Sequence, residues 1–141
     1  MPEHKTYTVY PFHGVERIRF GLSRQACREL IAAPFRTFRR SDFDPAETDA
    51  FHALGMQLSF DPGGRLEFIE LAPPARVRYL GVELLAGQNL SEVISALLAQ
   101  GLEGARDEVG IDYPTAGFGL YAPDETLEAV SVYRRGYYDT D

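Results

Sequence analysis

The sequence predicts a single α+β domain spanning residues 1–141, in which one or more antiparallel sheets are covered by two helices. Three observations lead to this prediction. Two segments carry apolar residues at helical spacing, two pairs of β-prone runs flank strong turns, and the same order of elements occurs twice along the chain. A chain of 141 residues is long enough to bury a complete hydrophobic core without disulfides or metals.

The first helix is predicted after a short β-prone run at residues 15–20. Ser23 is a suitable N-cap, because its hydroxyl can accept a backbone N–H of the first turn. Apolar residues then recur every three or four positions through RQACRELIAA, and Pro34 ends the helix because it disfavours helical geometry at the preceding residue. Residues 1–11 are predicted as an edge strand or a loose terminus, and residues 35–50 as a loop with one helical turn.

The first hairpin is predicted between residues 55 and 71. Met56, Leu58 and Phe60 alternate with polar residues, which is typical of a strand with one apolar face. Asp-Pro-Gly-Gly at 61–64 indicates a tight turn, because proline presets one dihedral angle and glycine permits positive φ. The return strand RLEFIEL has no clear apolar face, so we expect either partial cover on both faces or a bulge.

The second helix is the most clearly amphipathic segment of the chain. It follows a strand predicted at residues 77–85 and interrupted at Gly81. Asn89 with Glu92 three residues later is a reciprocal capping pattern, and Gly101 suits the left-handed position that ends a helix. Between them, five apolar residues form one stripe, which predicts a helix that packs on a sheet.

The order of strand, capped helix, loop and hairpin occurs twice, at residues 15–71 and 79–139. In the second half an acidic loop is predicted at 102–112 and the hairpin at 117–133. Four pairs of positions correspond when one gap is allowed: Gly55 with Gly117, Leu58 with Leu120, and Leu66-Glu67 with Leu127-Glu128. We interpret this as an internal repeat, although any two helix-plus-hairpin units look alike to some degree. Neither half could bury its sheet face alone, so the halves are expected to share a core.

The charge of the chain is uneven and argues for a protein partner. The net charge is −7; residues 1–40 carry eight basic and three acidic groups, so residues 41–141 carry a net −12. An acidic body repels nucleic-acid phosphates but speeds encounter with a basic protein. The arginines of the first segment are expected to be solvated or to pair with acids downstream.

Other classes of protein find little support in the composition. A single cysteine excludes an intramolecular disulfide, and three histidines without a Cys–His cluster argue against structural zinc. There is no apolar run of about 20 residues for a membrane helix and no start of the signal-peptide kind. We therefore expect a cytoplasmic protein with no membrane segment, no cofactor and no metal.

No motif assigns an enzymatic reaction. Cys27 with a histidine could form a thiol–imidazole pair, but it lies on the apolar side of the predicted helix, where a free cysteine is usually a buried hydrophobe. Gly117-Phe118-Gly119 lacks the following helix that a dinucleotide site needs, so close backbone packing explains it better. Glu70 is the one candidate for a half-buried acid.

The candidate binding residues lie near the C-terminus, where tyrosine, arginine and acids gather. Tyrosine and arginine are enriched at binding hot spots because they bury area while keeping a polar group. The alternative is that the tyrosines cover the core edge and the arginines are solvated. The predicted partner-binding residues are Tyr121, Asp124, Glu125, Tyr133, Arg134, Tyr137, Tyr138 and Asp139.

Two resemblances accompany these observations. FGLSRQACRELI followed by a hairpin with a glycine-rich turn resembles the helix-then-hairpin unit of the small outer-membrane lipoprotein A family and of the tandem-repeat β-lactamase inhibitor proteins. The size, the acidity and the ending GLY…VSVYRRGYYD resemble small bacterial cytoplasmic proteins, some of which act as immunity partners of secreted toxins. The second resemblance implies an inhibitor that occupies a toxin's surface.

The leading hypothesis is thus a non-enzymatic protein-binding protein, in the form of an immunity-type inhibitor whose partner is a basic toxin domain. An alternative is a small-ligand-binding domain or small enzyme with a pocket between helices and sheet, using Glu70, His52 or Tyr121 as polar groups. A third possibility is a homodimer formed through an open sheet edge.

Overall fold

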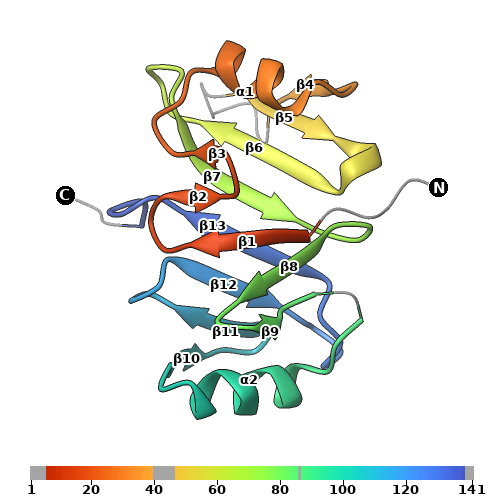
Figure 1. The fold of residues 1–141 in the computed structure, drawn as a ribbon, viewed down its shortest axis with the longest axis vertical. Helices are drawn as coiled ribbons and strands as arrows, with labels where there is room; N and C mark the ends of the chain where they lie inside the picture. The colour runs from red at the N-terminus through yellow and green to blue at the C-terminus, as the bar shows by residue number, and fades with distance from the viewer. Residues whose placement is uncertain (1–5, 40–46, 86, 139–141) are drawn as a thin grey trace.

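The computed structural model describes residues 6–39, 47–85 and 87–138, and it is mainly β-structure, with 42% strand and 17% helix. The predicted α+β class, a sheet covered by two helices, is therefore wrong. The described residues form a five-stranded and an eight-stranded sheet, and the two helices lie at opposite ends of the molecule (Figure 1).

The large sheet consists of two antiparallel meanders. Its strand order is β10-β11-β12-β13-β7-β6-β5-β4, so that the meanders meet at the antiparallel pair of β7 and β13. The strands are β4 (Arg36–Phe38), β5 (Thr48–Phe51), β6 (Met56–Phe60), β7 (Leu66–Leu71), β10 (Ala105–Arg106), β11 (Gly110–Tyr113), β12 (Phe118–Tyr121) and β13 (Ala129–Tyr133).

The small sheet covers the middle of the large one. Its order is β3-β2-β1-β8-β9, with β1 parallel to β8 and the other neighbours antiparallel. It lies across β7, β13 and β12, and the two sheets share one continuous hydrophobic core (Figure 1). The strands are β1 (Thr6–Tyr10), β2 (Gly14–Val15), β3 (Ile18–Arg19), β8 (Arg76–Tyr79) and β9 (Val82–Glu83).

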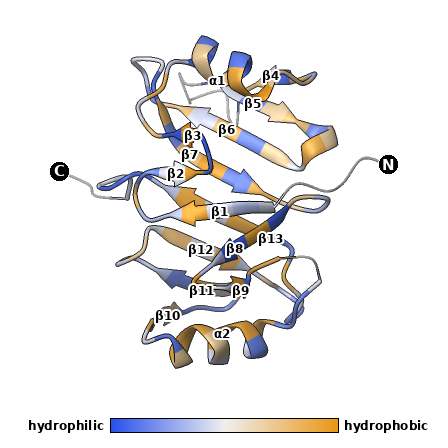
Figure 2. Cartoon of the chain, viewed as in Figure 1, coloured by the Kyte–Doolittle hydropathy of each residue, from blue (hydrophilic) through white to orange (hydrophobic). Residues whose placement is uncertain are grey.

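Both predicted helices are present, and the predicted N-caps Ser23 and Asn89 are confirmed. In α1 (Arg24–Ile31) the Ser23 hydroxyl accepts the Ala26 N–H at 3.1 Å. In α2 (Leu90–Ala99) the Asn89 side chain accepts from the backbone of Ser91 and Glu92. Figure 2 shows α2 as largely hydrophobic and α1 as more polar, which agrees with three buried residues in α2 and one in α1. A single 3₁₀ turn, η1 (His52–Leu54), precedes β6.

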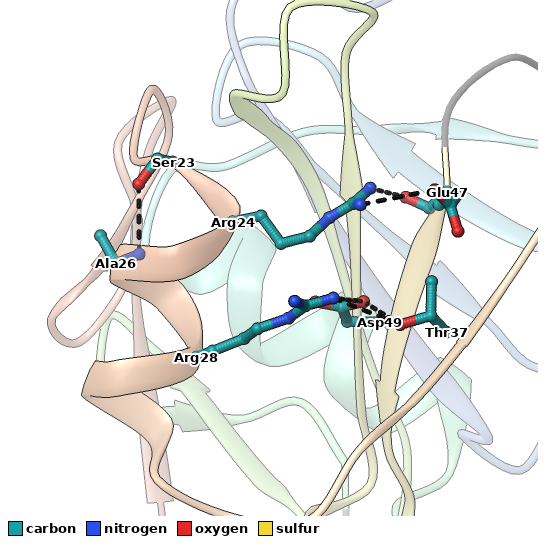
Figure 3. A network of polar contacts seen from close by, with 7 residues as sticks. All are labelled: Ser23, Arg24, Ala26, Arg28, Thr37, Glu47 and Asp49. Carbon is teal, nitrogen blue, oxygen red and sulfur yellow. Dashed lines mark hydrogen bonds and ion pairs between the residues drawn. The ribbon is translucent and has the colours of Figure 1, made fainter.

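Polar side chains fasten α1 to the large sheet. The Arg28 guanidinium donates to Asp49 at 2.8 and 3.0 Å, and the Thr37 hydroxyl donates to the same carboxylate at 2.8 Å (Figure 3). Asp49 is completely buried. Arg24 forms a second, more exposed ion pair with Glu47 at 3.6 Å. Two arginines of the basic first segment thus pair with acids downstream, as expected.

Two loop predictions are wrong for one reason. Residues 35–50 contain β4 and most of β5, and residues 102–112 contain β10 and most of β11. Neither segment alternates clearly between apolar and polar residues, because β5 is buried along its whole length and β10 is exposed along its whole length. Their strand conformation comes from pairing with β6 and β12, which no local pattern reveals. Residues 6–10 form an inner strand between β2 and β8, not an edge strand.

The aligned residues of the two halves occupy matching positions. Leu66 exchanges backbone hydrogen bonds with the chain that enters α1. In the second half Leu127 donates to the Gln88 carbonyl before α2, and the Glu125 carbonyl accepts from the Leu90 N–H. Gly55 and Gly117 open the two hairpins with φ of 67° and 72°. The β6–β7 pair also contains the irregularity that the unclear faces of residues 65–71 suggested, at Ser59/Phe60. Whether a duplication produced these halves stays a prediction.

None of the helices in the described ranges has the length and apolar character needed to cross a membrane.

Candidate binding site on the outer face of the large sheet

The face of the large sheet that points away from the small sheet carries a row of polar and small residues. Directly opposed residues in antiparallel strands point to the same face, and neighbours along one strand point to opposite faces. Ile111, Leu120 and Val130 are buried in the shared core, so the residues beside them face outward. This outer row runs through Asp112, Gly119, Ser131, Glu70 and Gln57.

A cavity of about 430 Å³ lies at the Asp112 end of the outer row. Gly119 opens it: a Cβ atom at this position would lie 3.2 Å from Asp112 Oδ1, so any side chain would press on that carboxylate. The polar and aromatic residues that line the cavity are Asp107, Asp112, Tyr121, Ser131, Tyr133 and Tyr138.

Asp112 and Tyr133 form the central polar contact of the cavity. The Tyr133 hydroxyl donates to Asp112 Oδ1 at 3.0 Å. Burial raises the pKa of the Asp112 carboxyl, hydrogen bonds from Tyr133 and from the backbone of Tyr113 partly offset this, and the charge of Asp107 adds to the increase. Burial also raises the pKa of the Tyr133 phenol, and the bond to Asp112 raises it further, so Tyr133 stays protonated and donates. Among the described residues Asp112 has no ion-pair partner.

Tyrosines from the chain after β13 extend the site across the middle of the sheet. Tyr138 packs edge-on against Tyr133, with ring centroids 4.8 Å apart, and Tyr137 lies 5.0 Å from Phe68. Tyr138 is 62% exposed and Tyr121 is 45% exposed, so both present ring surface to solvent at the cavity.

The structure brings together part of the predicted set. Tyr121, Tyr133 and Tyr138 line the cavity, and Tyr137 packs beside it.

The other predicted residues lie elsewhere. Arg134 pairs with Glu67 at 3.2 Å and continues the β13–β7 contact, which is a structural role. Glu125 pairs with Arg106 at 2.7 Å, Asp124 is exposed in the β12–β13 turn outside the cavity lining, and Asp139 lies outside the described residues.

Four residues of the cavity were not among the residues predicted from the sequence: Asp107, Asp112, Gly119 and Ser131. The two acids fell in a segment predicted as a loop, so their side of the sheet could not be assigned. Close packing explains Gly117, where a Cβ atom would meet the Phe12 ring at 2.9 Å. Gly119 is different, because it leaves space open on the outer face.

Only two of the three alternative polar residues share a cavity, and that cavity is small. His52 and Glu70 line a second, smaller cavity of about 170 Å³ beside Gly55 and Pro73, whereas Tyr121 lies at the first cavity. Cys27 is fully buried, and burial raises the pKa of its thiol to about 11, opposite to the change that activates a nucleophile. In the described ranges, no three metal-ligating side chains are grouped as a metal site would require.

The fold and the site together define a two-sheet protein with an acidic, tyrosine-lined cavity on the exposed face of its larger sheet. Comparison with protein-family models finds no match, and comparisons with curated proteins and with solved structures find no similar protein.

Proposed function

We propose that the chain is a non-enzymatic protein-binding protein that uses the outer face of its large sheet. The observation that carries the proposal is the cavity itself, where exposed tyrosine rings surround a carboxylate that has no ion-pair partner among the described residues. Tyrosines supply large, rigid contact area together with a hydroxyl, which is why they recur at binding hot spots.

The partner is a protein with a basic surface. The net charge of −7 and the acids at the cavity favour a positively charged patch, since opposite fields accelerate encounter. An immunity-type inhibitor that covers a basic toxin domain in the cytoplasm is the form of this function that the resemblance implies. The free, buried Cys27 suits a reducing compartment.

Binding to the products of genes adjacent to its own, measured by calorimetry with purified proteins, tests the proposal. Tyr138→Ala and Tyr121→Ala are each expected to weaken binding by about tenfold or more, the effect typical of truncating a hot-spot tyrosine. Tyr10→Ala is the matched control, because Tyr10 is a 39% exposed tyrosine on the small sheet. An equal loss with Tyr10→Ala, or none with Tyr138→Ala, would contradict the assignment to the outer face.

Light scattering tests a second copy of this chain as the occupant of the outer face. A stable dimer that dissociates in Tyr138→Ala and stays intact in Tyr10→Ala would mean that a second copy of the chain, and not another protein, binds the outer face. A monomer at all concentrations would remove that alternative.

A second candidate function rests on a different cavity, which lies between α1 and the small sheet. It has a volume of about 430 Å³, within the range of small-molecule sites, and is lined by Tyr7, Glu16, Arg17, Ile18, Leu30, Ile31 and Leu54. Arg17 has no ion pair with any described residue, so an amphipathic carboxylate is the ligand class that would fit. Decanoate should raise the melting temperature of the wild type and not of Arg17→Gln; no shift with the wild type would exclude this function.

A further inference from the structure

We propose that the cavity on the outer face is a receptor for one arginine side chain of the partner, whose guanidinium binds Asp112 beside the rings of Tyr121 and Tyr138. This inference rests on the proposed function and specifies the chemistry that the same site recognises. It follows from the charge of the cavity, the hydrogen-bonding capacity of its carboxylate and the nature of its walls.

The cavity contains negative charge without a cation of its own. Asp107 and Asp112 both line it, and neither forms an ion pair with a described residue. Arg106 is adjacent to Asp107 in the chain, yet it pairs with Glu125 at 2.7 Å. Two carboxylates that share one partly enclosed space repel each other, and a bound cation would relieve that repulsion.

The carboxylate of Asp112 is oriented and still has acceptor capacity. Tyr133 donates to Oδ1 and so fixes the direction of the group. A carboxylate has about four acceptor sites, and the Tyr133 hydroxyl and the backbone of Tyr113 use two of them. Arginine presents five donors in a planar fork that matches a carboxylate, whereas lysine presents a compact, strongly hydrated charge.

The walls suit a guanidinium better than an ammonium group. Tyrosine rings attract cations through their π-face, and the flat guanidinium can also stack on them. This chain uses that contact elsewhere: guanidinium groups lie 4.4 Å from the Tyr10 ring and 4.3 Å from the Phe35 ring. The side chains of Tyr121 and Tyr138 offer similar ring surface at the cavity.

NMR titration of the full chain with N-acetyl-arginine amide tests the inference directly. The backbone amide signals of Gly119 and Ser131 should shift with saturation. N-acetyl-citrulline amide, the neutral isostere, should bind at least about tenfold more weakly, because it lacks the charge that the carboxylates attract. N-acetyl-lysine amide should also bind more weakly than the arginine probe. Equal affinities for arginine and citrulline would overturn the inference.

Two variants test whether Asp112 is the carboxylate that binds the arginine probe. Asp112→Asn keeps an oxygen to accept from Tyr133 and should lower affinity for the arginine probe by about tenfold or more. Glu108→Gln is the matched control, since it removes the same charge from the same segment outside the cavity lining. It should change affinity by less than about twofold. Equal losses in the two variants would mean that net charge, and not the Asp112 site, attracts the probe.

The inference and the proposed function fail in different ways. A partner protein that binds through Tyr138 while the arginine probe does not bind would leave the protein-binding face standing and refute the arginine receptor. An arginine probe that binds Asp112, together with a partner whose affinity is unchanged by Asp112→Asn, would show an arginine site that the partner does not use, and would refute this cavity as the protein-binding site.

Discussion

Asp49 lies in the first half of the large sheet and Asp112 in the second half. When the two strands that carry them are aligned, the two acids are one position apart, and they face opposite sides of the sheet. Residues 48–51 of β5 oppose 59–56 of β6, and residues 110–113 of β11 oppose 121–118 of β12 in the same way. Asp49 opposes Leu58 on the core side and is completely buried against Arg28. Asp112 opposes Gly119 on the outer side, where its side-chain hydrogen bond comes from the neutral hydroxyl of Tyr133.

The comparison separates a structural acid from a candidate binding acid. A shift of one position along a strand moves a side chain to the other face of the sheet. On the core side, Asp49 receives two bonds from Arg28 and one from Thr37, so three of its about four acceptor sites are used within the chain. On the outer side, Asp112 keeps capacity for a ligand.

The largest expected effect comes from breaking the buried pair. Arg28→Ala leaves the Asp49 carboxylate buried without a cation, and we expect the free energy of unfolding to fall by about 3 kcal/mol or more. Urea denaturation followed by circular dichroism measures this. The same substitution at Arg24, whose partner Glu47 is 44% exposed, should cost less than about 1 kcal/mol, because exposed ion pairs contribute little.

A double variant sharpens the contrast between the two halves. Arg28→Met combined with Asp49→Ile replaces the pair by apolar side chains, and isoleucine is the residue at the corresponding position 111. Because replacing both members of a buried ion pair is often neutral, most of the lost stability should return. If the double variant is no more stable than Arg28→Ala, the loss comes from Arg28 contacts other than those with Asp49.

The elements that the sequence predicted well are those with their own local signals. Ser23 and Asn89 cap helices through short-range hydrogen bonds, and Asp61 accepts from Gly63 and Arg65 in the predicted turn. β4, β5, β10 and β11 lack such signals, because they form by pairing with strands that are themselves well defined. Missing those four strands hid the eight-stranded sheet, so the helices were expected to cover a face that the small sheet covers.

The site was predictable only in part for the same reason. Tyr121, Tyr133 and Tyr138 were found because tyrosine near arginine is a compositional signal. Asp112 could not be assigned to a face without knowing that β11 is a strand, and Gly119 opens a cavity only because Asp112 opposes it. Arg134 and Glu125 carried the same compositional signal, but their charges are used in ion pairs within the chain.

Removing the single side-chain hydrogen bond to Asp112 tests how much that bond contributes to the pKa of Asp112 and to the stability of the fold. Tyr133→Phe should raise the pKa of Asp112 further, because the lost bond favours the ionised form. It should destabilise the folded protein by about 1 kcal/mol near neutral pH. NMR titration of the carboxyl signal and urea denaturation measure the two effects. Tyr10→Phe should change neither quantity, and an unchanged Asp112 pKa in Tyr133→Phe would mean that this bond does not form in solution.

Tyr113 extends the comparison to the core. It occupies the position that corresponds to Phe51, is 1% exposed, and has no hydrogen-bond partner for its hydroxyl among the described residues. Tyr113→Phe should therefore leave stability unchanged or increase it by up to about 1 kcal/mol. Thermal unfolding compared with Tyr121→Phe, where the hydroxyl is on an exposed residue, is the measurement. A clear loss of stability would show that an ordered water holds the hydroxyl.

The smallest expected effect is a gain in stability when Asp112 is replaced by asparagine, and its pH dependence identifies the cause. Burial and the charge of Asp107 raise the pKa of Asp112 above its ordinary value of 3.8, so the folded state holds the proton more tightly than the unfolded chain does. The stability contributed by protonated Asp112 is fully present below that ordinary value and is lost as the pH rises through the raised value.

Wild type and Asp112→Asn should therefore differ least in acid, and the variant should become relatively more stable as the pH increases. Urea denaturation of both proteins from about pH 3 to about pH 7 measures the difference, with Glu108→Gln as the control for net charge. A wild type that is more stable than Asp112→Asn at neutral pH would mean that the ionised carboxylate is held as firmly as Asp49. In that case the acceptor capacity of Asp112 could not explain a binding site. A wild type that is less stable than the variant fits an acid that is kept for binding a ligand, at a cost in stability.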